Sequence, residues 1–310
     1  MSILVGNQTR LLVQGITGRQ AQLNTVYMRE YGTRVVAGVT PGKGGTKLEI
    51  GVPIYDTVKE ALSRHPEINT SILYVPPLHV KEAAIEAIEA GVPFLVITTE
   101  RCPHHEVMEL LSLARKKGTR VLGPNSIGVI TPEECVVGLI GARVSTAHLC
   151  FKKGRVGVIS RSGGQASTVA YYLSSQGIGQ STVAGIGGDA FIGTRYRDLL
   201  ELFEQDEATE AVVAFGEVGT SAEEEAADFI QSGGFTKPFL CYIAGRDVLP
   251  GARYGHSGAL ISKGVGDVAS KRKALKKSGA IVLDHLDDLP KEVKKILKHN
   301  EPGVIIVDRS

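Results

Sequence analysis

The chain has 310 residues, of which 43% are hydrophobic and 22% charged, a composition typical of a globular protein, and its length predicts two domains. Its net charge of +2 is too small for nucleic-acid binding to be a main function. The densest basic cluster, 271–277, is expected to form the solvated face of a helix. No uncharged apolar run approaches the roughly 20 residues that cross a bilayer, and the first residues do not resemble a signal peptide.

The cysteines are too far apart to form a C-x-x-C motif, which argues against a zinc site and against a small disulfide scaffold. Scattered thiols of this kind are typical of a reducing cytoplasm, which is the location we predict. We expect no metal site in this chain. The cysteines are Cys102, Cys135, Cys150 and Cys241.

The first expected strand, 10–14, is a continuous apolar run that leads directly into a glycine turn. The turn, 15–21, has the pattern G-x-x-G-x-x-A and precedes a helix expected over 22–30. A strand, a glycine turn and a helix N-terminus together form a seat for an anion, because free backbone N–H groups and the helix dipole point at the ligand.

The second expected strand, 33–39, lacks the acidic residue that holds a ribose hydroxyl in nicotinamide-binding units. Lys43 stands among glycines just beyond the end of this strand. A cation there suits the ribose phosphate of NADP or coenzyme A and disfavours NAD. A plain flexible loop is the alternative interpretation.

Strands and helices alternate through the rest of the first half, which predicts a doubly wound parallel sheet with ligands at the carboxyl ends of its strands. His104 and His105 stand at the start of a helix, where adjacent side chains diverge, so a solvated pair is favoured over a metal site. The expected strands are 71–75, 94–97 and 120–122, and the expected helices are 80–90 and 106–117.

The second half opens with an irregular stretch, 133–153, which we expect to be the crossover between the domains. A strand over 155–159 then ends in residues 160–164 (SRSGG), before a helix over 165–175. Small residues, a helix N-terminus and a nearby arginine make this turn a second expected anion seat.

The alternation continues and places one acidic residue, Glu217, at a strand end, where sites form. Glu223, Glu224 and Glu225 lie in the first turn of a helix that Ser221 is expected to cap, so the helix dipole accounts for them. The further expected strands are 181–186, 211–215, 239–243 and 280–283, and the further expected helices are 196–205, 221–230 and 290–298.

His256 lies between two glycines, after a loop rich in proline and glycine. Glycine is favoured where the chain must bend or approach another group closely, and neutral imidazole is a nucleophile near pH 7. The pattern predicts a histidine that can reach a reacting group, and a surface-loop histidine is the alternative. The apolar stretch 303–307 is expected to add a strand or to pack on a partner.

Seven motifs, spread in the same order over about residues 1–298, resemble the alpha subunit of succinyl-CoA synthetase. The resemblance implies an α/β protein with a CoA-binding Rossmann domain over 1–130, a crossover over 131–153, a flavodoxin-like ligase domain with a doubly wound parallel sheet over 154–299, and a tail over 300–310. The motifs are 12–18 (LVQGITG), 38–45 (GVTPGKGG), 123–125 (GPN), 158–163 (VISRSG), 185–189 (GIGGD), 216–219 (GEVG) and 255–259 (GHSGA).

The resemblance also implies a phosphohistidine at His256, with Glu217 orienting its imidazole. ATP or GTP, with magnesium, is then bound mainly by a separate beta subunit with an ATP-grasp fold. The residues implied to hold the phosphate or the substrate are Ser160, Ser162, Gly163 and Ser167. The residues implied to contact coenzyme A are Thr17, Gly18, Arg19, Gln20, Lys43, Thr98, Thr99 and Glu100.

The implied activity is reversible: succinate, CoA and ATP or GTP give succinyl-CoA, ADP or GDP and phosphate. Ser167 stands where the family has a tyrosine near the substrate, and Gly163-Gly164 resembles ATP-citrate lyases and citryl-CoA synthetases. A serine leaves more room than a tyrosine, so citrate or malate is the alternative substrate. An alternative of another class is a non-catalytic module that senses CoA or NADP, which leaves Glu217 and His256 unexplained.

Overall fold

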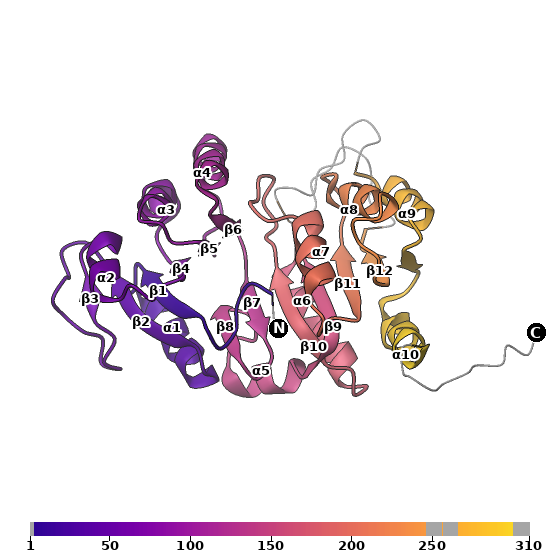
Figure 1. Ribbon diagram of the computed structural model, residues 1–310, viewed down its shortest axis with the longest axis horizontal. Coiled ribbons are helices and arrows are strands. Elements are labelled where there is room, and N and C mark those ends of the chain that lie inside the picture. Colours follow the sequence, from indigo (N-terminus) through magenta and orange to yellow (C-terminus); the bar gives the residue numbers. More distant parts are fainter. Residues whose placement is uncertain (1–2, 246–255, 257–265, 300–310) are drawn as a thin grey trace, which may run out of the picture.

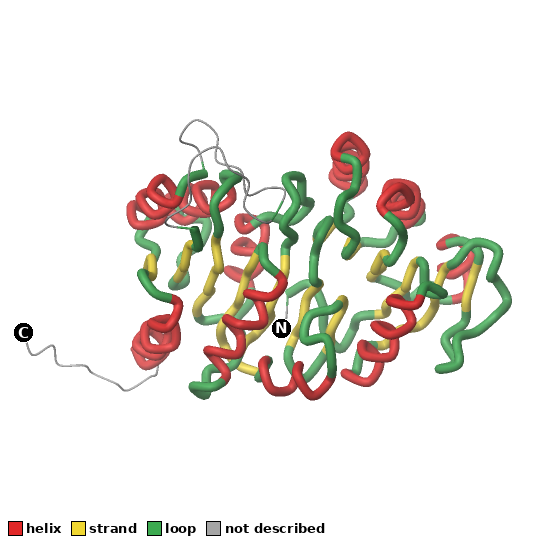
Figure 2. Tube along the Cα trace, turned by 180° about the vertical axis from the view of Figure 1, so that it is seen from behind, coloured by secondary structure: helices red, strands yellow, loops and turns green. Residues whose placement is uncertain are grey.

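The computed structural model describes residues 3–245, 256 and 266–299, and in it two α/β domains lie side by side along the long axis of the molecule (Figures 1 and 2). The expected tail over 300–310 and the residues on both sides of His256 lie outside the described residues. No helix in the described ranges is long and apolar enough to cross a membrane. The cytoplasmic location stays a prediction.

The first sheet has six strands in the order β3-β2-β1-β4-β5-β6, and every neighbouring pair is parallel. This is the Rossmann order, and its central strands are buried, which explains their continuous apolar runs. The strands are β1 (Arg10–Gln14), β2 (Arg34–Val39), β3 (Ile54–Tyr55), β4 (Thr70–Leu73), β5 (Phe94–Ile97) and β6 (Arg120–Leu122).

One helix covers the face of this sheet that meets the second domain, and three pack in series on the other face (Figure 1). The first helix begins at Arg19, three residues before the expected start, because the last three residues of the G-x-x-G-x-x-A pattern already belong to the helix. Gly32 ends it in a left-handed conformation. The helices are α1 (Arg19–Tyr31), α2 (Val58–Arg64), α3 (Val80–Glu89) and α4 (His104–Lys117), with a 3-10 turn, η1 (Pro77–His79).

The second sheet has seven strands in the order β13-β12-β11-β9-β10-β7-β8. Its five parallel strands, β9 to β13, lie in the order 2-1-3-4-5, which is the flavodoxin-like order. The expected fold class is confirmed, with an antiparallel hairpin added beside β10. The strands are β7 (Gly128–Thr131), β8 (Cys135–Gly138), β9 (Lys153–Ser160), β10 (Gln180–Gly185), β11 (Ala211–Gly216), β12 (Phe239–Ile243) and β13 (Ile281–Leu283).

The expectation of an irregular stretch over 133–153 is wrong. These residues form β8, which pairs with β7, and a helix, α5 (Val144–Cys150). Both hairpin strands have only four residues and are buried throughout, so neither shows the polar–apolar alternation that marks a strand. The domain limits at 130 and 153 stay predictions, although β7 already belongs to the second sheet.

The helices of the second domain also divide between the two faces of the sheet. On one face α6 (Gly163–Ser174) packs against α5 and α10 (Leu289–His299). On the other, α7 (Tyr196–Gln205), α8 (Ala222–Gln231) and α9 (Val268–Lys277) pack in series, and a 3-10 turn, η2 (Leu286–Asp288), precedes α10.

Two expectations for this helix layer are wrong. Ser221 occupies the N-cap position of α8, but its hydroxyl donates to the carboxylate of Glu225 (2.7 Å) and caps no backbone N–H. The basic cluster on α9 is not uniformly solvated, because Lys271 is fully buried while Lys273 is exposed. Residue type alone predicts that both lysines are exposed to solvent. The carboxylate partners of Lys271, the buried Glu223 and the partly buried Glu224, come from another helix.

Side chains from both domains hydrogen-bond across their junction. The hydroxyl of Thr33 donates to the carbonyl of Val136 in β8 (2.6 Å) and accepts from its N–H (3.0 Å). The hydroxyl of Ser126 donates to the carbonyl of Gly185 at the end of β10 (2.5 Å). The hydroxyl of Thr194 donates to Val121 O in β6 (2.7 Å). These bonds satisfy buried backbone groups and tie the two sheets together.

We predict that Thr33→Val lowers the free energy of unfolding by about 2 kcal/mol, because it leaves a buried N–H and a buried carbonyl without a partner. The measurement is urea unfolding of the full chain. The control is Thr46→Val, which removes an exposed hydroxyl that donates to Lys43 O. Equal midpoints for the two variants would contradict the role assigned to Thr33.

Candidate active site

The candidate nucleophile lies at the carboxyl edge of the second sheet, near the place where the strand order reverses. The chain leaves β9 toward β10 on one side and returns to β11 on the other. Ligand sites of open α/β sheets form at such a point. Three loops meet there: Arg161 follows β9, Gly188 and Asp189 follow β10, and Glu217 follows β11.

His256 and Glu217, which sequence reasoning proposed as partners, are in contact. Nδ1 of His256 lies 2.9 Å from both carboxylate oxygens of Glu217. The side chain of His256 is 29% exposed and that of Glu217 is 14% exposed, so the carboxylate is shielded while the ring still reaches solvent. Glu217 engages one ring nitrogen, and the other nitrogen, Nε2, is the one that can react.

Gly188 makes room for the imidazole. A Cβ built at this glycine would overlap Cγ and Cδ2 of His256, so the ring lies directly over the backbone after β10. Any larger residue would push the ring away from Glu217. This close approach gives a physical reason for the second glycine of the pair in the 185–189 motif.

Among the described residues, Arg161 brings a positive charge to the site, and sequence reasoning noted it only as a nearby arginine. Its side chain is 2% exposed, and Nε donates to Oε1 of Glu217 (3.1 Å). A second guanidinium nitrogen donates to the carbonyl of Asp189 (2.8 Å), and the carboxylate of Asp189 accepts from the amide of Asn125 (3.1 Å). The network therefore runs from the end of β6 in the first domain to His256.

The charges around the imidazole act in opposite directions on its pKa. The hydrogen bond to Glu217 raises the pKa of His256 above its ordinary value, and the charges of Glu217 and Asp189 act in the same sense. Partial burial of the ring and the positive charge of Arg161 lower it. The net result is a raised pKa.

The second expected anion seat is the turn between β9 and α6. Ser162 is the N-cap of α6 but makes no side-chain cap, so the first-turn N–H groups have no side-chain acceptor there. The hydroxyl of Ser160 accepts from Ser162 N (3.1 Å) and donates to Ser162 O (2.8 Å), which shapes the turn. Gly163 permits close packing, since a Cβ there would meet Ile127 at 2.8 Å. Ser167 lies partly buried one turn into α6.

The first expected anion seat follows β1. Gly15 has φ +73°, and a Cβ there would meet the carbonyl of Tyr74 at 2.7 Å, so the turn needs glycine. Thr17 is tied to Thr40 at the end of β2 by contacts of 3.3 and 3.4 Å. Gly18 is the N-cap of α1 without a side-chain cap, and Arg19 and Gln20 are exposed in its first turn.

The other residues expected to contact coenzyme A lie at the same edge of the first sheet. Lys43 is exposed after β2, and its loop is fastened where Gly44 N donates to Asp56 (2.8 Å). Thr98 and Thr99 follow β5. The hydroxyl of Thr98 donates to the last carbonyl of β4 (3.0 Å), and the hydroxyl of Thr99 donates to a carbonyl two residues further along the chain (2.8 Å). Glu100 is exposed beside them. The turn, the cation and the uncapped helix start fit an anionic ligand that carries phosphates.

Within the described residues we also compared two other kinds of group, clusters of metal-binding side chains and cysteine thiols. No group of three or more His, Cys, Asp or Glu within residues 3–245, 256 and 266–299 could hold a metal ion. All four cysteines are buried free thiols, and burial raises the pKa of Cys102 to about 11, which keeps that thiol protonated at neutral pH.

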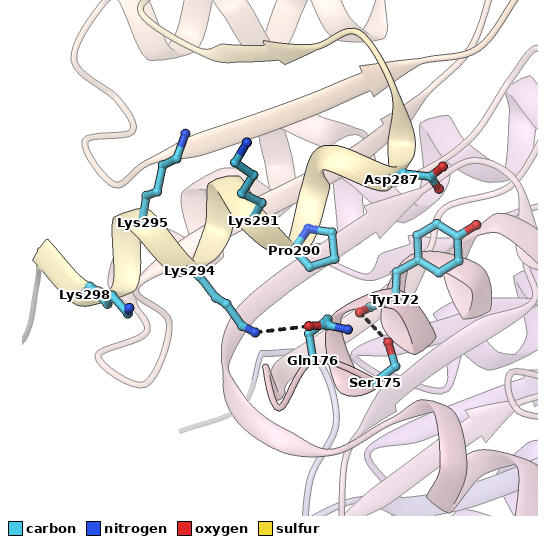
Figure 3. Close-up of a pocket in the computed structure, with 9 residues that line it drawn as sticks. All are labelled: Tyr172, Ser175, Gln176, Asp287, Pro290, Lys291, Lys294, Lys295 and Lys298. Atoms are coloured by element: carbon cyan, nitrogen blue, oxygen red, sulfur yellow. Dashed lines mark hydrogen bonds between the residues drawn. The ribbon is translucent and has the colours of Figure 1, made fainter.

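A basic hollow of about 610 Å³ lies between the carboxyl end of α6 and α10 (Figure 3). Four lysines of α10 line it, and Lys294 Nζ donates to Gln176 Oε1 (3.2 Å). It adjoins the end of α6 opposite Ser162 and contains neither His256 nor Glu217, so we do not assign the reaction to it.

The chain is similar to known proteins over most of its length. The chain matches the family model described as CoA binding domain over residues 6–101 and the model described as CoA-ligase over residues 159–281. It is 45% identical over 282 residues to succinate–CoA ligase [ADP-forming] subunit alpha 2 of Archaeoglobus fulgidus, covering 91% of this chain and 95% of that protein. It is 40% identical to the ADP-forming sulfoacetate-CoA ligase subunit SqwL of Acholeplasma sp, covering 96% and 98% of the two chains.

Among solved structures, the fold resembles ATP citrate lyase of Methanosaeta concilii in complex with (3S)-citryl-CoA, with a TM-score of 0.87 and 22% identity. The match covers 99% of this chain and 53% of the lyase chain, so this chain spans about half of that protein. At this identity the likeness shows the fold alone.

The fold and site define a two-domain protein of the CoA-ligase class, in which a CoA-binding domain precedes a ligase domain. Within that class, the chain belongs to the family of succinate–CoA ligase alpha subunits, which are ligases.

We predict that Glu217→Gln lowers the pKa of His256, because the amide keeps an oxygen that can accept from Nδ1 but removes the negative charge. The measurement is an NMR titration of His256 in the full chain. The control is Glu225→Gln, which removes a carboxylate paired with the half-exposed Arg195. An unchanged titration of His256 in Glu217→Gln would contradict the contact described here.

The sign of the linked stability effect follows from the raised folded-state pKa. The Glu217 interaction stabilises the fold fully below the ordinary histidine pKa of 6.5 and is lost as pH rises through the folded pKa. Glu217→Gln should therefore cost more stability at about pH 5.5 than at about pH 9.

Proposed function

We propose that this chain is the alpha subunit of a nucleotide-dependent acid–CoA ligase that works reversibly through a phosphorylated His256. The observation that carries the proposal is the contact of 2.9 Å between Nδ1 of His256 and the carboxylate of Glu217, at the strand-order reversal of a CoA-ligase domain. The alternative of a non-catalytic CoA or NADP sensor gives no reason for this contact.

The reaction needs an intermediate because a carboxylate is a poor acyl donor. In the forward direction, Nε2 takes the terminal phosphoryl group of the nucleotide and the nucleoside diphosphate leaves. A carboxylate oxygen of the substrate then takes the phosphoryl group from Nε2, which gives an acyl phosphate and restores the imidazole. The CoA thiolate attacks the acyl carbon and inorganic phosphate leaves, so the thioester forms without expelling oxide.

The residues of the site fit these steps. Glu217 accepts from Nδ1–H, which leaves Nε2 with the lone pair that attacks. The first-turn N–H groups of α6, beyond Ser162 and Gly163, can donate to the phosphoryl oxygens, where the helix dipole also favours negative charge. Ser160 shapes that turn, and we assign Ser167, one turn along the helix, to the substrate.

Coenzyme A would span the two domains. Its phosphates would bind at the turn after β1, with Lys43 near the ribose phosphate and Thr98, Thr99 and Glu100 at the neighbouring strand end. Asn125 after β6 contacts Asp189 after β10, so the carboxyl edges of the two sheets adjoin. A long ligand anchored on the first edge can therefore direct its thiol toward the second.

The nucleotide would belong to a partner. Among the described residues, we assign the turn after β1 to coenzyme A and the turn after β9 to the phosphoryl group in transfer, which leaves neither for a nucleoside triphosphate. The relatives named above are subunits. We propose a beta subunit with an ATP-grasp fold, which binds ATP or GTP with magnesium and presents the nucleotide to the exposed side of His256 in a hetero-oligomer.

Succinate is the leading substrate, because the succinate–CoA ligase relatives match almost the whole chain. Citrate or malate is the alternative, supported by the small side chain of Ser167 and by the resemblance of Gly163-Gly164 to ATP-citrate lyases and citryl-CoA synthetases. Sulfoacetate is a further candidate, since a ligase subunit acting on it is 40% identical to this chain.

We expect γ-labelled ATP to label this chain at His256 when the chain is purified with its beta subunit, and His256→Asn to abolish the label. Asparagine keeps a hydrogen-bonding side chain but has no nucleophilic ring nitrogen. The measurement is acid-labile incorporation of phosphate, followed by mass spectrometry of the modified residue. If the His256→Asn complex still became labelled and turned over, the phosphohistidine mechanism would be wrong.

A screen of acids tests the substrate. We expect thioester formation with succinate to exceed that with malate, citrate or sulfoacetate by at least about tenfold in kcat/KM, measured on the purified pair; this corresponds to about 1.4 kcal/mol of differential binding. The His256→Asn pair is the blank for each acid. A higher kcat/KM for one of the other acids would contradict succinate as the substrate, but it would not contradict the phosphohistidine mechanism.

A further inference from the structure

A buried ion cluster lies behind the active-site carboxylate. The side chains of Glu223 and Lys271 are 2% and 0% exposed, and they form an ion pair. Lys271 Nζ also donates to Glu224 Oε2 (3.0 Å) and to the carbonyl of Thr220 (2.9 Å). The other oxygen of Glu223, Oε1, accepts from the backbone N–H of Glu217 (3.1 Å).

These hydrogen bonds hold both ends of the loop that carries Glu217. Glu223 holds the first residue after β11, and Lys271 holds the carbonyl of Thr220, the second residue before α8. Gly216 has no room for a side chain, because a Cβ there would meet Oε1 of Glu223 at 2.8 Å. The backbone around Glu217 is therefore set by the position of the Glu223 carboxylate.

The same cluster links this loop to the chain segment that follows His256. Lys271 is on α9, and Gly219 N donates to the carbonyl of Gly266, just before that helix (2.8 Å). Contacts of α8 and α9 thus hold the loop of Glu217 against the segment just before α9, which follows His256 in the chain. No reaction step described above uses Glu223 or Lys271.

A buried ion pair is a poor way to gain stability, because desolvation of both charges offsets their attraction and apolar residues of similar volume often serve as well. Its fixed geometry, by contrast, can specify the position of a neighbouring group. We propose that Glu223 and Lys271 are positioning residues, which fix the backbone of Glu217 so that its carboxylate meets Nδ1 of His256. The reaction that this serves rests on the proposed function.

Two variants of one residue separate positioning from general stability. Glu223→Gln and Glu223→Met both remove the charge paired with Lys271 and are similar in size, but only glutamine keeps an oxygen that can accept from Glu217 N–H. In both, Lys271 retains Glu224 and Thr220 O. A merely structural ion pair predicts equal effects, whereas positioning predicts loss in Glu223→Met and rescue in Glu223→Gln.

The first measurement is the NMR titration of His256 in the full chain, which needs no substrate. Arg161 and Asp189, the other charged groups that act on the ring, are unchanged in these variants. We expect the His256 titration in Glu223→Met to shift toward that in Glu217→Gln, and the titration in Glu223→Gln to stay near that of the parent chain.

The second measurement is the rate of His256 labelling in the complex with the beta subunit. A displacement of about 1 Å can cost about 100-fold in rate, so we expect a loss of that order in Glu223→Met and a loss of less than about tenfold in Glu223→Gln. If Glu223→Met does not fold, Glu223→Met with Lys271→Met takes its place, because an apolar pair removes the uncompensated charge. Lys273→Met, on the exposed face of α9, is the matched control.

The outcomes distinguish this inference from the function on which it rests. If the parent complex shows no label at His256, the proposed function fails, and the titration still decides whether Glu223 positions Glu217. The positioning role is overturned if Glu223→Met, or its double variant with Lys271→Met, keeps the titration and labelling rate of the parent chain. It is also overturned if Glu223→Gln and Glu223→Met have the same effect.

Discussion

The structure of the candidate site depends on one hydrogen bond, between a carboxylate of the β11–α8 loop and Nδ1 of His256. The bond requires the two groups to meet at about 3 Å, and each neighbouring loop contributes to that meeting. Gly188 lets the ring lie on the backbone after β10, and Arg161, which follows β9, donates to Oε1 of Glu217. The flavodoxin-like strand order brings these three loops together because β9, β10 and β11 are neighbours in the sheet.

The two domains are coupled through backbone groups and short polar side chains. Ser126 and Asn125 follow the last strand of the first sheet, yet their partners, Gly185 and Asp189, follow or end β10 of the second. Asp189 in turn accepts from Arg161 through its carbonyl. A short series of hydrogen bonds therefore connects the first domain to Glu217.

Sequence predicted the elements well where a strand is a continuous apolar run, as at β1 and β5, whose bounds agree with the structure. It failed over 133–153, where short buried strands carry no periodic signal. The contact between His256 and Glu217 could be proposed from family motifs. The burial of Lys271 could not be foreseen, because a lysine in a basic run is normally solvated and its carboxylate partners lie 47 and 48 residues away in the chain.

The opposed charges around the imidazole have a chemical logic. The carboxylate raises the pKa of His256, and a protonated imidazole has no lone pair for nucleophilic attack. Arg161, buried against the same carboxylate, and the partial burial of the ring both lower that pKa. Glu217 can therefore fix the orientation and tautomer of the ring while its charge is shared with the guanidinium. Arg161 thus offsets part of the rise in the pKa of His256 that Glu217 causes, while Glu217 still orients the ring.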